Sequence, residues 1–306
     1  MPDWFHALAK RVSNRGRWGA DDELGTLNFV TAAATLRGAR CVRRGESFSL
    51  ALPLHADGPQ TGRIPGRINP VHTMVAINTP FTGDPSMFCA SDDVVTMGLQ
   101  AATHWDALAH VSYDGKLYNG FPASTITETG AARCSIDKLR TIVTRGLLLD
   151  VARAKGAGRL PAPYAITAED LDAAVALARI EVLSGDIVLV RTGQMELLRA
   201  GDKDAYRTPC PGLSSRTVEW LHRHQVAAVA TDTMSFEVFP CEDPSALLPV
   251  HLLHLVEMGL LQGQNFDLDA LAADCATDGV YEFLLEASPQ PFLGAVGSPV
   301  NPVATK

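Results

Sequence analysis

The alternation of apolar and polar residues predicts β-strands in the first half of the chain. Residues 46–54 (ESFSLALPL) alternate with the period of two that is typical of a half-buried strand. Two further β-like runs follow, VHTMVAI and DDVVTMGL, and a glycine- and proline-rich segment at residues 55–70 precedes them. We expect this segment to be a long loop, and long loops in compact domains often carry function.

Helix and strand patterns alternate in the second half. The clearest helix is predicted at residues 166–180 (ITAEDLDAAVALARI), where Thr167 can cap a first turn rich in acidic residues and apolar residues recur at helical spacing. SSRTVEWLHRHQ and HLLHLVEMGL have helical patterns, and GVYEFLLEA is typical of a strand. Continuous apolar runs predict buried strands at residues 139–153, 184–193 and 226–233. The pattern therefore predicts an α/β fold with a mixed sheet in one domain over residues 1–306, with residues 1–40 as an extension packed on it.

The composition narrows the class of protein. Hydrophobic residues make up 46% and charged residues 20% of the 306 residues, which is typical of a globular protein. The net charge of −8 argues against nucleic-acid binding, because contact with phosphates needs a basic surface. No apolar run approaches the roughly 18 residues that span a bilayer. The six cysteines contain no CxxC pair, so we expect reduced thiols in a cytoplasmic protein that binds a small molecule and neither nucleic acid nor membrane.

The strongest chemical signal lies in QAATHWDALAHVSYDGKLYNG, residues 100–120. His104 and Asp106 share one face of an extended strand, and their donor atoms suit Zn or Mn. Gln100 would lie on the same face if the strand continued to it. His110 follows closely and is a natural general base for a water molecule that a metal polarises. From spacing alone, a set of unrelated polar groups at a strand end remains an equally good interpretation.

The same stretch resembles the cyclase family of metal-dependent hydrolases, which includes kynurenine formamidases, isatin hydrolases and trans-dienelactone hydrolases. The family pattern is His-x-Gly-Thr-His-x-Asp-x-Pro-x-His. The chain matches it at Thr103, His104, Asp106 and His110. It departs from it at the first histidine, the glycine and the proline, which are Gln100, Ala102 and Leu108. GRWGADDELGTLNF near the start and VGSPVNPVATK at the end also resemble the longer members, so the likeness covers nearly the whole chain.

The resemblance extends to a second segment, LPVHLLHLVEMGLLQGQNF. In the family a histidine and, further along, a Glu-Asn pair contribute to the metal centre. His251, Gln264 and Asn265 stand at these positions, so a glutamine replaces the glutamate. His254 follows His251 by one helical turn and is a candidate for contact with substrate. Two histidines in an apolar segment are otherwise more often structural.

The two glutamines limit the kind of metal centre that the resemblance implies. An amide oxygen binds a divalent ion more weakly than a carboxylate does. Asp106 is then the single obvious acidic ligand, which argues against two ions. The implied centre holds one Zn or Mn ion on His104, Asp106 and His251, with Gln100 or Gln264 as an oxygen ligand or hydrogen-bond donor. Complete loss of the metal is the alternative.

The resemblance also implies a swivelling β/β/α fold, a homodimer or homotetramer, and a reaction. The reaction is hydrolysis of a lactone, lactam, imide or acyl amide by metal-activated water, which cleaves a C–N or C–O bond next to a carbonyl. A serine nucleophile is disfavoured because the chain has no G-x-S-x-G elbow. Two other functions remain open. One is a metal-dependent cyclase or dehydratase in secondary metabolism, and the other is a metal-free binding protein on the same fold.

Further residues are candidates for the catalytic machinery and the substrate pocket. Besides His110 and His254, Asp232 follows a predicted strand and could orient a histidine or bind substrate; the alternative for Asp232 is a loop cap. Three aromatic residues border the polar segments and could stack on a flat substrate, although buried aromatic residues more often belong to the core. These are Trp105, Tyr118 and Phe236.

Overall fold

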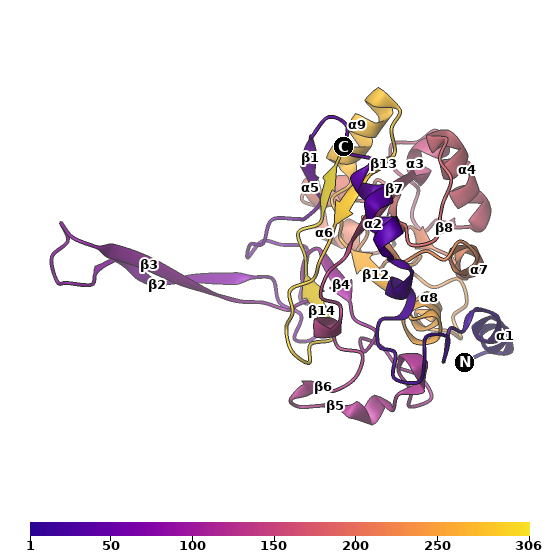
Figure 1. Ribbon diagram of the computed structural model, residues 1–306, viewed down its shortest axis with the longest axis horizontal. Coiled ribbons are helices and arrows are strands. Elements are labelled where there is room, and N and C mark those ends of the chain that lie inside the picture. Colours follow the sequence, from indigo (N-terminus) through magenta and orange to yellow (C-terminus); the bar gives the residue numbers. More distant parts are fainter.

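A nine-stranded mixed sheet forms the centre of the fold in the computed structural model, which describes residues 1–306 (Figure 1). Its four middle strands are parallel and the outer ones run antiparallel to their neighbours. In spatial order the strands are β1 (Ser47–Ser49), β15 (Val303–Thr305), β13 (Glu282–Glu286), β7 (Val143–Asp150), β9 (Ile187–Arg191), β11 (Ala228–Thr231), β12 (Leu261–Gln264), β4 (His104–Asp106) and β14 (Gly297–Pro299). The expected α/β fold with a mixed sheet is confirmed.

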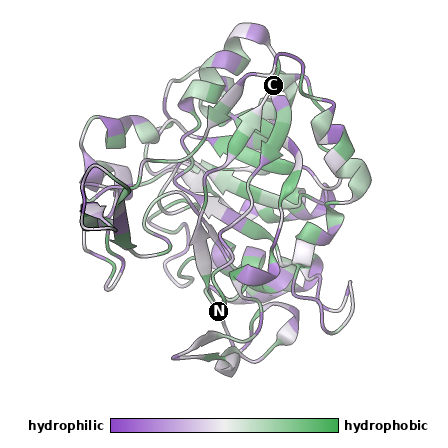
Figure 2. Cartoon of the chain, turned by 60° about the vertical axis from the view of Figure 1, so that its left-hand side comes forward, coloured by the Kyte–Doolittle hydropathy of each residue, from purple (hydrophilic) through white to green (hydrophobic).

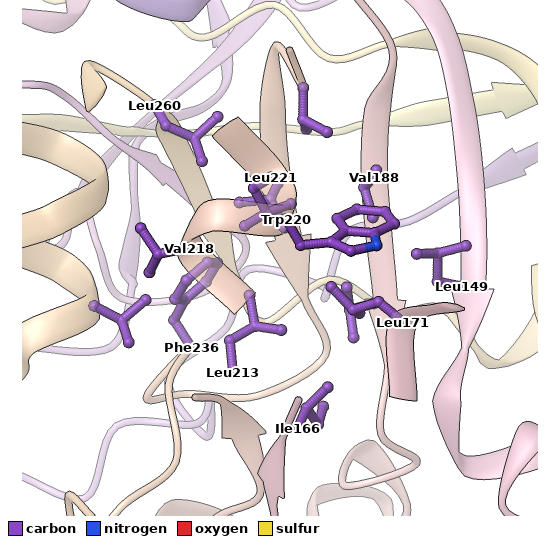
Figure 3. Close-up of a cluster of buried hydrophobic side chains, with 14 of the residues drawn as sticks. Leu149, Ile166, Leu171, Val188, Leu213, Val218, Trp220, Leu221, Phe236 and Leu260 are labelled. Carbon is purple, nitrogen blue, oxygen red and sulfur yellow. The ribbon is translucent and has the colours of Figure 1, made fainter. Parts of the chain in front are cut away.

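The middle strands are hydrophobic because both of their faces are buried. Along β7, Leu147 and Leu149 face one core cluster, whereas Leu148 faces the other. Trp220 packs in the first cluster, near Val188 and Leu149 (Figure 3). Coloured by hydropathy, these strands stand out against the mixed colours of the surrounding helices (Figure 2). The continuous apolar runs of the sequence are therefore explained by burial on both sides.

Helices and short connecting strands surround the sheet. The helix predicted from residue 166 begins at Ala168, and Thr167 caps it in a reciprocal capping box with Asp170. None of the helices combines the length and the apolar composition that crossing a lipid bilayer requires. The α-helices are α1 (Asp3–Val12), α2 (Ala32–Ala39), α3 (Val151–Ala154), α4 (Ala168–Ala178), α5 (Met195–Arg199), α6 (Lys203–Arg207), α7 (Val218–Arg223), α8 (Pro249–His251) and α9 (Asp269–Asp278). The remaining elements are 3₁₀-helices at Gly25–Phe29, Tyr118–Gly120, Ala123–Thr125, Ile136–Lys138 and Ser215–Thr217, a π-helix at Leu252–Met258, and the strand pairs β5 (Ile126–Thr127) with β6 (Gly130–Ala131) and β8 (Ala165–Ile166) with β10 (Gly212–Leu213).

The strand predicted at residues 46–54 is shorter than its hydropathy pattern. Only Ser47–Ser49 pair with another strand, and the backbone of Leu50 instead bonds to Pro302 and Asp267. A Leu-Pro-Leu sequence follows and has no strand partner, since proline cannot donate to a ladder. The segment at residues 55–70 is irregular throughout, as the glycines and prolines predict.

A long hairpin projects away from the body of the protein (Figure 1). It consists of β2 (Val71–Pro80) and β3 (Cys89–Thr96), which pair only with each other. Apolar side chains are exposed on both of its faces: Val71, Met74, Val75, Ile77, Phe81, Met87, Phe88, Val94 and Val95. A two-stranded hairpin is marginally stable alone, and a large exposed apolar surface of this kind marks a site of association.

We expect a second copy of the chain to cover this hairpin. Val75→Asp with Ile77→Asp should convert an oligomer to a monomer, because each charge would have to be buried in the interface. The measurement is the molar mass from light scattering after size exclusion. A control with equally exposed apolar residues elsewhere, Leu36→Asp with Leu293→Asp, should retain the wild-type mass. A monomeric wild type, or the same mass for all three proteins, would contradict the expectation.

Candidate active site

The short strand β4 brings the polar residues of the site onto one face of the sheet. Asp106 lies opposite Gln262 of β12 on one side and opposite Gly297 of β14 on the other. His104 lies opposite Gln264. Residues directly opposite each other in antiparallel strands point to the same face. One face of the sheet therefore carries the side chains of His104, Asp106, Gln262 and Gln264, in agreement with the two-residue period of a strand.

Asp106 is the centre of this group. Its carboxylate is fully buried, and Oδ2 accepts hydrogen bonds from Gln264 Nε2 at 2.7 Å and Gln262 Nε2 at 3.3 Å. Oδ1 has no hydrogen-bond partner and lies 3.3 Å from His104 Nε2 and 3.7 Å from His110 Nε2. Burial raises the pKa of Asp106, but the positive charge that the nearby His110 and His104 rings carry when protonated outweighs burial and holds this pKa well below its ordinary value. The carboxylate is therefore charged.

The orientation of His104 directs an unpartnered nitrogen at that carboxylate. Its Nδ1 lies 2.7 Å from the carbonyl oxygen of Ala102, which also accepts from Asn265 Nδ2. A carbonyl can only accept, so Nδ1 carries a proton, and Nε2 presents a lone pair when it carries none. Nε2 is buried and makes no hydrogen bond. Two electron-rich atoms 3.3 Å apart repel each other unless a proton or a cation lies near both.

His251 is fixed by a carboxylate that the sequence patterns do not reveal. Its Nδ1 lies 2.6 Å from Glu237 Oε1, and the same carboxylate accepts from the backbone amides of Val250 and His251. Nε2 is thereby turned toward Gln264, whose Nε2 lies 3.4 Å away. A buried carboxylate behind an imidazole is the usual support of a metal-binding histidine. The available signal for Glu237 was one acidic residue within the buried segment MSFEVF.

The residues present fit one divalent ion better than two. No group of three or more His, Cys, Asp or Glu side chains has ligand geometry in the structure. The pair formed by His104 and Asp106 does fit, because two ligands at about 2.1 Å from a tetrahedral ion lie about 3.4 Å apart. His251 is a further imidazole whose orientation is supported by a carboxylate. Asp106 is the one carboxylate beside this pair of donor atoms, and its single negative charge offsets only half of the charge of one divalent ion.

The two glutamines at the family's ligand positions, Gln100 and Gln264, are placed differently from each other. Gln264 donates to Asp106 through its Nε2, as the predicted role of hydrogen-bond donor requires. Gln100 lies in a turn before β4, because the strand does not extend back to it. The Nε2 of Gln100 lies only 2.4 Å from the point where a Cβ at position 297 would be, so the space is available only because residue 297 is glycine. Since Gly297 is opposite Asp106, Gln100 still reaches the same face of the sheet.

Asp232 has a structural role. It is fully buried, and its carboxylate accepts from Thr192 N, Thr192 Oγ1 and Gly193 N at 2.7 to 3.1 Å. These bonds tie the end of β11 to the segment after β9. The placement favours the loop-capping alternative over the predicted catalytic role.

His254 and Phe236 lie beneath the site rather than at its surface. His254 is fully buried, makes no side-chain hydrogen bond and has its pKa lowered to about 3 by burial, so its ring is neutral. Phe236 belongs to the core cluster of Figure 3 and packs edge-on against His254 and His251, with ring centroids 5.5 and 5.9 Å away. Phe236 therefore supports the histidines and does not line a substrate pocket.

The structure places Trp105 and Tyr118, two aromatic residues predicted for the substrate pocket, in core clusters. Trp105 points to the opposite face of β4 from Asp106, because adjacent residues of a strand alternate. It is buried against Phe266, and its Nε1 donates to the carbonyl of Ala287. Tyr118 is also buried. Both rings are core residues, as buried aromatic residues more often are.

A pocket of about 340 Å³ opens directly onto the site. Its polar lining includes His110, His251 and Gln264, whereas His104 and Asp106 lie deeper. A larger hollow of about 420 Å³ beside β1 contains no histidine or acidic residue. The remaining lining of the site pocket is Ile64, Arg67, Val111, Arg207, Met234, Ser235, Phe239, Leu247 and Leu248.

Known proteins share this α/β fold. The Cyclase family model matches residues 48–238. A crystal structure described as a novel cyclase is 38% identical, with a TM-score of 0.88 and coverage of 97% of this chain and 99% of that chain. Isatin hydrolase A from Ralstonia solanacearum is 20% identical, with a TM-score of 0.63 and coverage of 90% and 95%. A potential metal-dependent hydrolase with cyclase activity is 16% identical, with a TM-score of 0.51 and coverage of 85% and 96%.

The extent of these matches establishes the family. The protein belongs to the Cyclase family, as its motifs predicted. A comparison with curated proteins finds no match. The likeness to the isatin hydrolase and to the metal-dependent hydrolase is a likeness of fold, since both are distant in sequence.

Asp232→Ala should lower the free energy of unfolding by about 1 to 3 kcal/mol or more, because buried amide donors would lose their acceptor.

Burial raises the pKa of Asp232 from 3.8 to about 6, so the folded protein binds this proton more tightly than the unfolded chain. The wild-type free energy of unfolding should therefore fall as pH rises from 3.8 to about 6, and the variant should lack that contribution. Urea unfolding measures both effects. The exposed-site control Asp92→Ala should match wild type, and equal stability of the two variants would contradict the structural role.

Proposed function

We propose that the protein is a metal-dependent hydrolase of small molecules. The substrate class is a lactone, lactam, imide or acyl amide, and the reaction cleaves a C–N or C–O bond next to a carbonyl. The observation that carries the proposal is the buried, unpartnered pair of His104 Nε2 and Asp106 Oδ1 below a pocket of small-molecule size. The isatin hydrolase and metal-dependent hydrolase that share the fold support this direction.

His104 and Asp106 would hold one Zn or Mn ion, with His251 as the third protein ligand. When bound, such an ion polarises a carbonyl and lowers the pKa of water. Ala102 and Glu237 fix the rings of His104 and His251, so both Nε2 atoms are preorganised. Gln264 holds the second oxygen of Asp106, which leaves the first one free to bind.

His110 is the proposed general base. Burial lowers the pKa of His110 below its ordinary value, although the charge of Asp106 acts in the opposite direction. The ring is therefore neutral near pH 7 and can accept a proton from the attacking water. Its Nε2 lies 3.7 Å from Asp106 Oδ1, so the carboxylate stabilises the imidazolium that proton transfer produces. His110 then returns the proton to the leaving group.

The cyclase or dehydratase alternative uses the same side chains to polarise a carbonyl without adding water. The metal-free binding protein uses only the pocket. These alternatives differ in the fate of solvent oxygen and in the need for His110, so one experiment separates them.

A panel of aryl lactones, lactams, cyclic imides and aryl formamides, incubated with metal-loaded protein in ¹⁸O water, should give a carboxylate product with one solvent oxygen. His110→Gln should lower kcat by about 10² to 10⁴. His55→Gln, in the exposed loop, is the matched control and should retain activity. Mass spectrometry follows the label.

Turnover without label would favour ring closure or elimination. Full activity of His110→Gln would remove its role as base. No conversion of any of the four classes would favour the binding protein.

A further inference from the structure

Two arginines in the site pocket have no partner of their own. Arg67 and Arg207 both line the pocket, together with His110. Neither guanidinium forms an ion pair with a carboxylate within 4.0 Å, and neither makes a side-chain hydrogen bond; the Nε of Arg207 is buried without any partner. By contrast, Arg63, in the same loop as Arg67, reaches Asp204.

The two arginines come from separate parts of the fold. Arg67 lies in the irregular segment that leads into β2, and Arg207 ends α6. Both are partly buried, and burial lowers the pKa of Arg67 against the opposing effect of the Asp106 charge, although a guanidinium stays charged at pH 7. A desolvated cation without an anion is unfavourable. Two such cations in the lining of one pocket therefore point to an anion from outside the chain.

The charge balance of the site supports the same conclusion. Asp106 is the one carboxylate close to the proposed ion, and Glu237 is engaged behind His251. With a divalent cation bound, these acids leave the arginine charges uncompensated. A guanidinium matches a carboxylate geometrically through two parallel hydrogen bonds. The rest of the wall, including Val111, Leu247 and Leu248, is apolar and suits a hydrocarbon ring or chain.

We propose that the substrate carries a carboxylate, which Arg67 and Arg207 bind while its apolar part lies against Leu247 and Leu248. This inference rests on the proposed function in taking the same pocket as the substrate site. The arginines then select the substrate and orient its scissile carbonyl toward His110. Neutral lactones and amides of the same shape bind the pocket more weakly, so their hydrolysis needs a higher substrate concentration.

The test compares benzoate with benzamide, which has nearly the same shape and no charge. Isothermal titration of metal-loaded wild type should show benzoate bound at least about tenfold more tightly. Arg67→Gln and Arg207→Gln should each weaken benzoate binding, and the double variant should remove the preference. Arg63→Gln, in the same loop, should behave as wild type. Metal content and thermal unfolding of every variant confirm that only the arginines differ.

Equal binding of the two probes by wild type would overturn the proposal. So would a benzoate preference that survives in the double variant, because benzoate would then bind the ion and not the arginines. The test needs no turnover, so it can succeed even if the hydrolase proposal fails. Hydrolysis of neutral substrates that is insensitive to both arginine substitutions would overturn the anion site while leaving the hydrolase standing.

Discussion

A buried negative charge on Asp106 is the constraint on which the site depends. A fully buried carboxylate is costly unless donors or cations compensate it. Gln262 and Gln264 satisfy one oxygen, and the histidine rings approach the other without a hydrogen bond. The remaining need is for positive charge between Asp106 and His104. A divalent ion meets it, and the proposed chemistry then follows from where that ion is held.

The sheet supplies the precision that this constraint requires. β4 is only three residues long, yet it is hydrogen-bonded to β12 and β14 on its two edges, so the directions of its side chains are fixed. Gly297 leaves room for the amide of Gln100, and any larger residue there would displace it. Trp105 anchors the strand from the opposite face through Phe266 and the carbonyl of Ala287. The rigid core and the reactive face are thus two sides of the same strand.

Local patterns predicted the parts of this structure that depend on neighbours in sequence. The two-residue period of a strand correctly placed His104 and Asp106 on the same face of β4. The helix near Thr167 begins where the capping residue predicted. The motif resemblance identified the family, and with it the fold. The hydrogen bond between Asp106 and Gln264 depends on the register of β4 and β12, which lie far apart in the sequence. Only the resemblance to the family connected these two segments.

Other features were missed because they depend on contacts between distant segments. The support of His251 by Glu237 and the presence of Arg67 and Arg207 in the lining of one pocket leave no local pattern. Gln100 was expected to share the face of His104 and Asp106 if the strand continued to it, but the chain turns before that strand begins. The apolar alternation of β2 and β3 predicted strands correctly, yet hydropathy could not show that no other part of this chain covers them.

The most direct test of the account is the metal content of purified wild type and of Asp106→Asn, measured by plasma mass spectrometry after supplying Zn and Mn. The asparagine keeps the shape and removes the charge, and circular dichroism verifies folding. The account predicts about one ion per wild-type chain and none in the variant. A folded wild type that takes up no ion would contradict it, because the charge beside Asp106 would then be a proton on His104. Two ions per chain would equally contradict the single-ion site.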